Sequence, residues 1–211
     1  MKIGLLGFGS MGRTHAYCVN NIPYFFDAQI NAQIYGVCTR HIEKAKEACE
    51  RFSLGFYTDN EDDIIYKPEI DAVDICTPNY LHSIIAVDAF KAGKHVFCEK
   101  PDAIDVTEVL KMKNAADEAG KVLMVIRNNR FATASQYAKK FIEDGKMGEI
   151  YCGRCGWQRR RGIPGKGGWF TTKAQSGGGP LIDLGVHMID LAVWLMGNPT
   201  PISVSANTYT K

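Results

Sequence analysis

The first 126 residues alternate between two hydrophobic patterns. Apolar runs of four to six residues, which are typical of buried strands, occur at 2–6, 33–38, 71–76, 95–98 and 122–126. Segments with helical spacing of their apolar residues lie between them, at 10–20, 41–52, 80–93 and 105–120. Strands that are apolar almost throughout are buried on both faces, so this alternation predicts a doubly wound parallel sheet covered by helices.

The pattern changes after residue 130. A helix is predicted at 132–145, a longer strand at 149–160, an apolar helix at 181–197 after a glycine-rich loop, and a final strand at 201–210. We therefore expect two domains, a nucleotide-binding domain at 1–127 and the first part of a second, sheet-based domain at 128–211.

Composition narrows the possible partners and location. The net charge of +2 is close to neutral, so we expect no nucleic-acid partner. No apolar run looked long enough to cross a bilayer, and the first residues lack the pattern of a signal peptide. Three of the seven cysteines (Cys38, Cys76 and Cys98) lie inside apolar runs, which favours free thiols in a reducing cytoplasm over disulfides.

The pair Cys152 and Cys155 has the spacing of some redox and metal sites. In the predicted strand, however, an offset of three residues places the two side chains on opposite faces. No second Cys or His pair follows at zinc spacing, so we expect no metal.

The loop Gly7-Phe8-Gly9-Ser10-Met11-Gly12 has the GxGxxG pattern directly after the first predicted strand and opens a helix. In that context Gly7 permits a tight turn, Gly9 lets the backbone approach a pyrophosphate, and Gly12 lets helix and strand pack closely. The amino end of the helix then offers unpaired N–H groups to the anion. The loop predicts a dinucleotide site; a simple glycine turn is the alternative.

The second strand ends at Thr39 and Arg40, with no carboxylate to bind a ribose 2′-hydroxyl. An arginine at this place accommodates a 2′-phosphate, so NADP is favoured over NAD. A surface arginine at the start of a helix is the alternative.

Polar clusters follow three of the strands, where an open parallel sheet binds its ligands. They are Thr77-Pro78-Asn79, Glu99-Lys100-Pro101 and the segment 127–130. Because the proline restricts Lys100 to extended geometry, it holds a lysine at the predicted cleft. In the later helix, Asp183, His187 and Asp190 share one face, and a histidine between carboxylates can serve as an acid or base.

The motifs GFGSMGRTHA, TPNYLH, CEKP and GGGPLIDLGVHMIDLAVWLMG together resemble the Gfo/Idh/MocA oxidoreductases, the glucose–fructose oxidoreductase and inositol dehydrogenase family. The resemblance implies a Rossmann domain, a second α+β domain with a mostly antiparallel sheet that is incomplete here, and NAD(P)-linked chemistry at a carbon of a sugar or polyol. It implies Lys100, Asp183 and His187 as the catalytic residues, with a cis peptide before Pro101. Together with the motifs, it predicts cofactor contacts at Gly7, Phe8, Gly9, Ser10, Met11, Gly12, Thr39, Arg40, Thr77, Pro78, Asn79, His82, Glu99, Lys100 and Asn128.

The substrate is expected near the loop before the late helix, at Arg159, Trp169 and Phe170. His187 is the first choice for the base, oriented by Asp183, with Lys100 bonded to the same substrate oxygen. A redox-assisted glycosidase or lyase and a non-catalytic NAD(P) sensor remain as alternatives.

The final strand at 201–210 would leave an unpaired edge at Lys211. Two strands and one helix are also too little for an independent sheet domain. We therefore expect that a longer chain was cut, or that another subunit pairs with this edge. A homo-oligomer (a dimer or tetramer) formed through the second-domain sheet is expected.

Overall fold

The computed structural model describes residues 1–158 and 167–209. The chain forms two compact units. The first contains Met1–Ile126 and Gly162–Asp183, and the second contains Arg127–Arg161 and Leu184–Lys211. Each unit is described by itself.

The first unit is built on a parallel sheet of six strands in the order β3-β2-β1-β4-β5-β6. The strands are β1 (Lys2–Leu6), β2 (Gln33–Cys38), β3 (Phe56–Thr58), β4 (Ala72–Ile75), β5 (His95–Cys98) and β6 (Leu123–Val125). This order is that of the Rossmann fold, in which the chain reverses direction across the sheet between β1 and β4. The predicted α/β class with a parallel sheet is confirmed.

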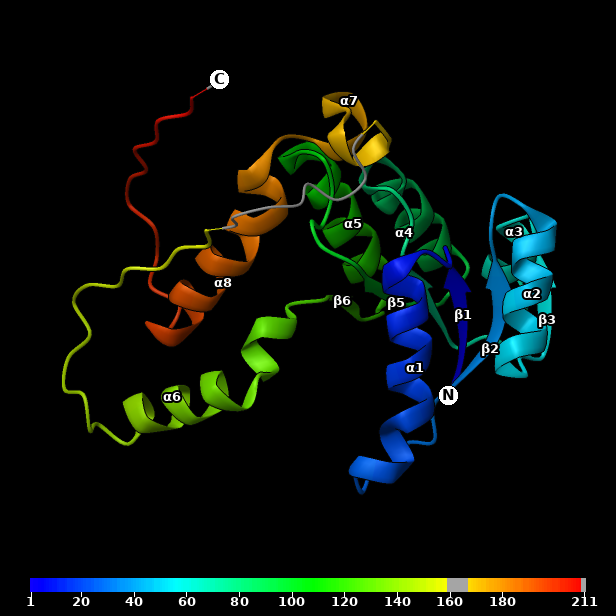
Figure 1. Cartoon of the computed structure of the whole chain (residues 1–211), viewed down its shortest axis with the longest axis horizontal. Helices are drawn as coiled ribbons and strands as arrows, with labels where there is room; N and C mark the ends of the chain where they lie inside the picture. Colours follow the sequence, from blue (N-terminus) through cyan, green and yellow to red (C-terminus); the bar gives the residue numbers. More distant parts are fainter. Residues whose placement is uncertain (159–166, 210–211) are drawn as a thin grey trace. The chain divides into compact units, whose positions relative to one another are not determined.

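Helices cover both faces of this sheet (Figure 1). They are α1 (Ser10–Phe25), α2 (Ile42–Phe52), α3 (Asp62–Ile65), α4 (His82–Lys91) and α5 (Val106–Ala119). The short helix α7 (Lys173–Ser176) packs instead on the 3-10 turns η1 (Asn79–Leu81) and η3 (Trp169–Thr171). The Asp105 side chain caps α5 by accepting from the N–H of Glu108. Gly120 ends the same helix with φ 62°, the left-handed cap expected of a terminal glycine.

The main core of the first unit lies between the sheet and the paired helices α4 and α5. Ile75, Phe90, Val96 and Met112 are each at most 1% exposed and belong to one apolar cluster. Burying a side chain of this size stabilises the fold by about 1.5–3 kcal/mol. The cluster therefore anchors β4 and β5, whose carboxyl ends carry the predicted site residues.

The second unit contains the 3-10 turn η2 (Asn128–Phe131), α6 (Thr133–Glu143) and α8 (Val186–Leu195). The π-helical turn η4 (Leu181–Gly185) leads into α8 across the division between the units. Within the second unit, Arg130 Nε donates to Asp190 Oδ2 at 2.7 Å. The Asp190 carboxylate is therefore engaged by an arginine.

Both strands predicted in the second domain are absent from the part of the chain that the structure describes. Residues 149–158 and 201–209 have no strand, and almost all are exposed. A strand gains its stability from a hydrogen-bonded neighbour, and no described strand pairs with either stretch. The antiparallel sheet of this domain therefore stays a prediction.

One helical stretch, Lys173–Leu195, is long and apolar enough to cross a membrane by length and composition alone. The sequence reading missed it because short helices and turns join there into one stretch. The stretch includes two aspartates, Asp183 and Asp190, both bonded to basic side chains. The absence of a membrane partner stays a prediction.

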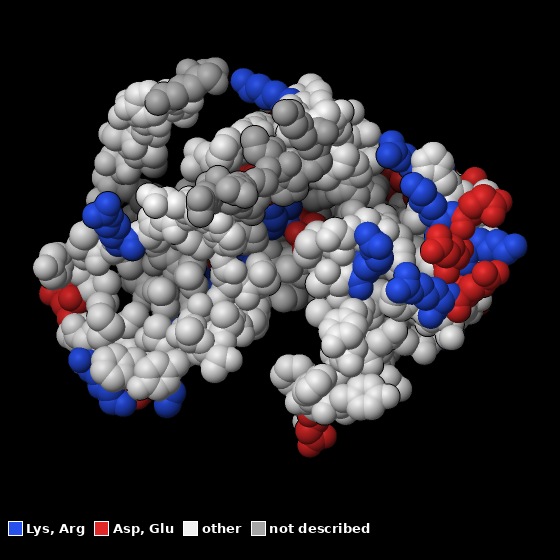
Figure 2. Space-filling model, viewed as in Figure 1, with Lys and Arg blue, Asp and Glu red and all other residues white. Residues whose placement is uncertain are grey.

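Basic and acidic side chains are interspersed over the end of the first unit that carries α2 and α3 (Figure 2). Elsewhere on the face shown, charged groups are more scattered and white side chains dominate. The face shown has no continuous basic patch of the kind that binds nucleic acid.

Candidate active site

The glycine loop joins β1 to α1 with the geometry that its sequence predicts. Gly7 has φ +94°, and a Cβ at this position would meet the carbonyl oxygen of Cys76 at 2.5 Å. A Cβ on Gly12 would overlap the carbonyl oxygen of Gly7. Both positions therefore exclude a side chain, one because of the turn and one because the helix packs against the loop.

Gly9 differs from its neighbours because it faces open space. A Cβ there would meet no atom within 4 Å, so the backbone is accessible to a ligand. Gly9 caps α1 without a side-chain hydrogen bond, and no acidic residue stands in the first turn. The helix therefore presents unpaired N–H groups and its positive dipole end to an anion.

The hydroxyl group of Thr77, after β4, is also placed for a ligand. Thr77 Oγ1 is buried and has no hydrogen-bond partner among the described residues. A buried polar atom of this kind is usually paired, so a bound group is a natural partner for it. Gly9, the α1 terminus and Thr77 together fit a dinucleotide between the carboxyl ends of β1 and β4.

The end of β2 has the chemistry that the sequence indicated. Thr39 Oγ1 donates to the carbonyl oxygen of His41 at 2.8 Å, and Arg40 is exposed. Neither residue is a carboxylate, so neither offers an acidic acceptor to a ribose 2′-hydroxyl.

The loops that follow β4 and β5 are tied together by buried side chains. Asn79 donates from Nδ2 to the carbonyl oxygen of Ser176 at 2.8 Å. His82 is fully buried, with Nδ1 at 2.8 Å from the Pro101 carbonyl oxygen and Nε2 at 3.0 Å from that of Thr77. Both ring nitrogens of His82 are thus occupied by backbone groups, so its part in a cofactor site is to hold the loops.

Lys100 stands at the carboxyl end of β5. The peptide between Lys100 and Pro101 is cis, as the family resemblance implied. Lys100 Nζ donates to Asp183 Oδ1 at 2.8 Å and to the Asp183 carbonyl oxygen at 3.0 Å. Both side chains are about four-fifths buried, at 17% and 21% exposed. The structure therefore brings two of the three predicted catalytic residues into one ion pair.

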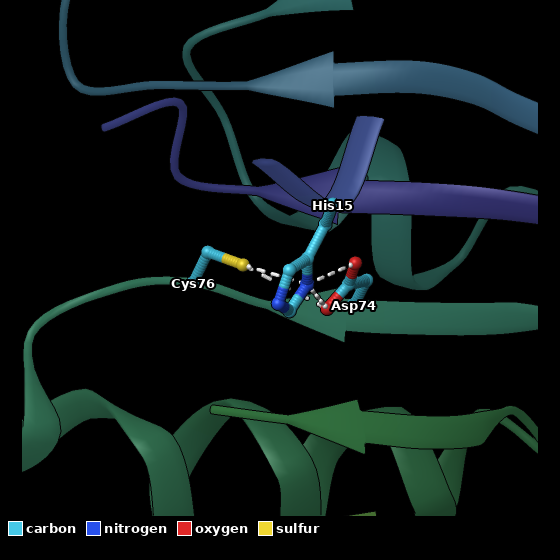
Figure 3. A group of neighbouring side chains, drawn as sticks. All are labelled: His15, Asp74 and Cys76. Atoms are coloured by element: carbon cyan, nitrogen blue, oxygen red, sulfur yellow. Dashed lines mark hydrogen bonds and ion pairs between the residues drawn. The ribbon is translucent and has the colours of Figure 1, made fainter. Parts of the chain in front are cut away.

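A second buried network, which the sequence reading missed, adjoins this pair. His15, on the second turn of α1, has Nδ1 at 2.9 Å from Asp74 Oδ2 and 3.3 Å from Cys76 Sγ (Figure 3). Its Nε2 lies 3.0 Å from Glu99 Oε1. The sequence did contain one signal of this network. Asp74 lies inside the apolar run DAVDIC, and a buried carboxylate requires a partner.

The ionisation of this network follows from its contacts. Burial alone would lower the pKa of His15, but hydrogen bonds with Asp74, Cys76 and Glu99 outweigh it and raise that pKa to about 12. Burial opposes ionisation of Glu99 as well, yet its bond to His15 lowers the net pKa of that carboxyl. Burial raises the pKa of the Cys76 thiol to about 12. His15 is therefore an imidazolium between two carboxylates at neutral pH.

His15, Asp74 and Cys76 also form a donor set that could hold a metal ion, since their ligand atoms lie within 4.8 Å of one another. Histidine binds a metal as the neutral imidazole, and cysteine binds it as the thiolate. The contacts here instead favour a charged His15 ring and a neutral Cys76 thiol. The expectation of no metal stays a prediction.

The remaining predicted residues are dispersed. His187 lies in α8, with its ring centroid 6.4 Å from that of Trp157. Asn128 is an exposed residue of the second unit. Trp169 and Phe170 form an edge-to-face pair at 5.4 Å. Arg159 lies outside the described residues, as do the two arginines that follow it.

Comparisons with known proteins identify the family of the chain. The GFO/IDH/MocA model, an oxidoreductase family with an NAD-binding Rossmann fold, matches residues 1–127, and the C-terminal domain model of that family matches residues 135–211. D-glucoside 3-dehydrogenase of Escherichia coli (strain K12) is 33% identical over 214 residues, which cover 100% of this chain and 58% of that protein.

Levoglucosan dehydrogenase of Pseudarthrobacter phenanthrenivorans is 35% identical over 214 residues, which cover 99% of this chain and 54% of that protein. A solved structure of a levoglucosan dehydrogenase in complex with NADH and levoglucosan matches with a TM-score of 0.85, covering 93% of this chain and 54% of that one. This chain thus spans little more than half the length of these relatives. Because the family model matches residues 1–127 and a relative is 33% identical over the whole chain, the chain belongs to the Gfo/Idh/MocA oxidoreductase family.

Proposed function

We propose that the protein transfers a hydride between NAD(P) and a hydroxyl-bearing carbon of a sugar, an inositol or a related polyol. The observation that carries the proposal is the buried ion pair of Lys100 and Asp183. Lys100 follows β5 and the glycine loop follows β1, so both lie at the carboxyl ends of the parallel strands. The substrates named for the relatives, a D-glucoside and levoglucosan, support a sugar hydroxyl as the reacting group.

The chemistry requires two transfers from the alcohol, a hydride and a proton. A bound nicotinamide supplies the hydride acceptor. Lys100 uses two of its three N–H donors on Asp183 among its described contacts, so the third can donate to the reacting hydroxyl and stabilise its developing negative charge. His187 takes the hydroxyl proton, and Asp183 orients the Lys100 amine through its two hydrogen bonds.

The finer choice of cofactor rests on the end of β2. We propose that Arg40 favours NADP(H), because it is exposed, positively charged and follows β2, where a ribose 2′-phosphate would lie. The NADH in the levoglucosan dehydrogenase complex shows what that relative binds. Comparing the affinities for NADPH and NADH, with Arg40→Ala beside the wild type, decides between them. A preference for NADH that Arg40→Ala leaves unchanged refutes the NADP assignment.

Two further proposals concern the role of the second unit and the cellular location. The first rests on the family resemblance and the second on the cysteines. We propose that residues 128–211 contribute to a mostly antiparallel sheet through which subunits assemble. A cytoplasmic location is proposed because Cys38 and Cys98 are buried free thiols. Size-exclusion chromatography with light scattering tests the first proposal, and cell fractionation tests the second.

The activity is tested by a panel of sugars and inositols with NADP and NAD, followed by cofactor absorbance at 340 nm. Lys100→Ala and His187→Ala should each lose at least about a hundredfold in turnover, while cofactor affinity changes little. Lys113→Ala, an exposed lysine on α5, is the matched control. Product formation without net change in absorbance would instead identify a redox-assisted lyase or glycosidase, and full turnover in either variant would remove that residue from the mechanism.

A further inference from the structure

We propose that His15 and His82 are positioning residues that hold the Glu99–Lys100–Pro101 turn from its two ends and thereby fix Lys100. The inference rests on the proposed function in one respect, the catalytic part of Lys100. The two histidines come from different helices, α1 and α4, and each connects the turn to the neighbouring strand β4 or its loop.

The first hold is built on the Glu99 carboxylate. Oε1 lies 3.0 Å from His15 Nε2, and Oε2 accepts the backbone N–H of Lys100 at 3.0 Å. The other nitrogen of His15 lies against Asp74, which is 4% exposed on β4. The main chain of Lys100 is thus linked through Glu99 and His15 to the central part of the sheet.

The second hold is built on the Pro101 carbonyl oxygen. His82 Nδ1 lies 2.8 Å from it, and His82 Nε2 lies 3.0 Å from the Thr77 carbonyl oxygen. His82 is 0% exposed and stands at the first position of α4, whose apolar residues fill the main core. The residue after Lys100 is therefore attached to a helix that packs into the main core.

The two rings are held in opposite charge states. His15 faces carboxylates at both nitrogens, with the Cys76 thiol beside Nδ1, so both nitrogens act as donors and the ring carries a charge. Burial lowers the pKa of His82, and this effect outweighs the contacts of its ring nitrogens with the Thr77 and Pro101 carbonyl groups, which act in the opposite direction. A neutral ring has one N–H, so His82 donates to one of its two carbonyl contacts at a time.

The consequence for Lys100 is geometric. A lysine side chain has four rotatable bonds, so its amine is placed only when the main chain and the far end are both fixed. Asp183 fixes the far end, and the two histidines fix the main chain on either side. A misplacement of a reacting group by about 1 Å can lower turnover about a hundredfold.

The ring states are tested by nitrogen-15 NMR of histidine side chains in the intact chain between pH 6 and 9. His15 should show the imidazolium pattern and His82 the neutral pattern throughout this range. A His15 ring that titrates near pH 6.5 overturns the proposal. So does loss of the imidazolium pattern on stoichiometric zinc addition at pH 7, because it would make His15 a metal ligand.

The positioning is tested by the reactivity of the Lys100 amine, which does not depend on turnover. Trinitrobenzenesulfonate labelling of the intact chain, read by mass spectrometry, should be at least threefold faster at Lys100 in His15→Gln than in the wild type. Lys113 labelling is the internal reference, and Tyr17→Gln, exposed on the same helix, is the control variant. Unchanged labelling of Lys100 in His15→Gln overturns the proposal.

With an active substrate, His15→Gln should lower kcat at least tenfold and change the Kd for NAD(P)H less than twofold. In a Glu99→Gln background the same substitution should lower kcat less than twofold, because the link through Glu99 is already broken. Independent effects of the two substitutions would overturn the proposal. Absence of turnover with every polyol, with the NMR and labelling results as expected, would reject the proposed function and leave the positioning intact.

Discussion

Replacing His15 with glutamine should change how the stability of the chain depends on pH. The folded-state pKa of His15, about 12, lies above the ordinary value of 6.5. The stabilisation from this group is therefore complete below pH 6.5 and is lost as pH rises towards the folded-state pKa. Between pH 7 and 9 the folded chain keeps a proton that the unfolded chain releases. Its unfolding free energy then falls by about 1.4 kcal/mol per pH unit.

Over these two units the wild type should lose about 2 to 3 kcal/mol relative to His15→Gln, which has no proton to release there. This slope requires only that the folded-state pKa of His15 stays above about 10. The assay is urea denaturation of the 211-residue chain at several pH values, followed by far-UV circular dichroism.

In His15→Gln, Asp74 and Glu99 lose their partner and could take up a proton, which would also change the slope with pH. A double variant controls for this effect. In His15→Gln/Glu99→Gln, Asp74 is the only carboxylate left in the network, so no acidic pair remains to hold a shared proton. Equal slopes in the wild type and the double variant between pH 7 and 9 would show that His15 is not charged, and would refute the account of the network.

Two further substitutions test the fold that carries the site. Asp105→Ala removes the cap of α5 and should lower the unfolding free energy by about 1 kcal/mol in urea denaturation, whereas exposed Asp117→Ala should change it by less than about 0.5 kcal/mol; equal effects would contradict the capping role. Gly12→Ala would place a methyl group against the Gly7 carbonyl oxygen, so the glycine loop must shift. Its melting temperature should fall and its NADPH affinity should drop at least tenfold in a fluorescence titration, and wild-type values for both would contradict the close packing.

The strands and long helices of the first unit could be predicted because burial imposes their patterns. Apolar runs such as HVFC are buried on both faces of the sheet, and the glycine loop has a backbone requirement visible in the sequence. The strand and helices missed in this unit, β3, α3 and α7, have only three or four residues each. Segments this short do not complete a hydrophobic period, so their pattern is not readable.

Side-chain partners were harder to predict because spacing along one element does not identify what lies opposite it. Asp190 shares a helical face with His187, yet in the structure it binds Arg130. His15 went unnoticed because its partners, Asp74 and Glu99, stand 59 and 84 residues away. The same limit applies to the strands expected near residues 150 and 205, since a strand depends on a neighbour that its own sequence does not specify.

The most direct test of the central claim, a dinucleotide site at the glycine loop, is a fluorescence titration of NADPH and NADH into the intact chain. The critical variant is Gly9→Ala, because a Cβ there meets no protein atom and so obstructs only a ligand. Exposed Gly156→Ala, where a Cβ also meets nothing within 4 Å, is the matched control. The account predicts saturable binding by the wild type and Gly156→Ala, and affinity at least tenfold weaker in Gly9→Ala with an unchanged melting temperature. Absence of binding by the wild type, or equal affinity in Gly9→Ala, would contradict it.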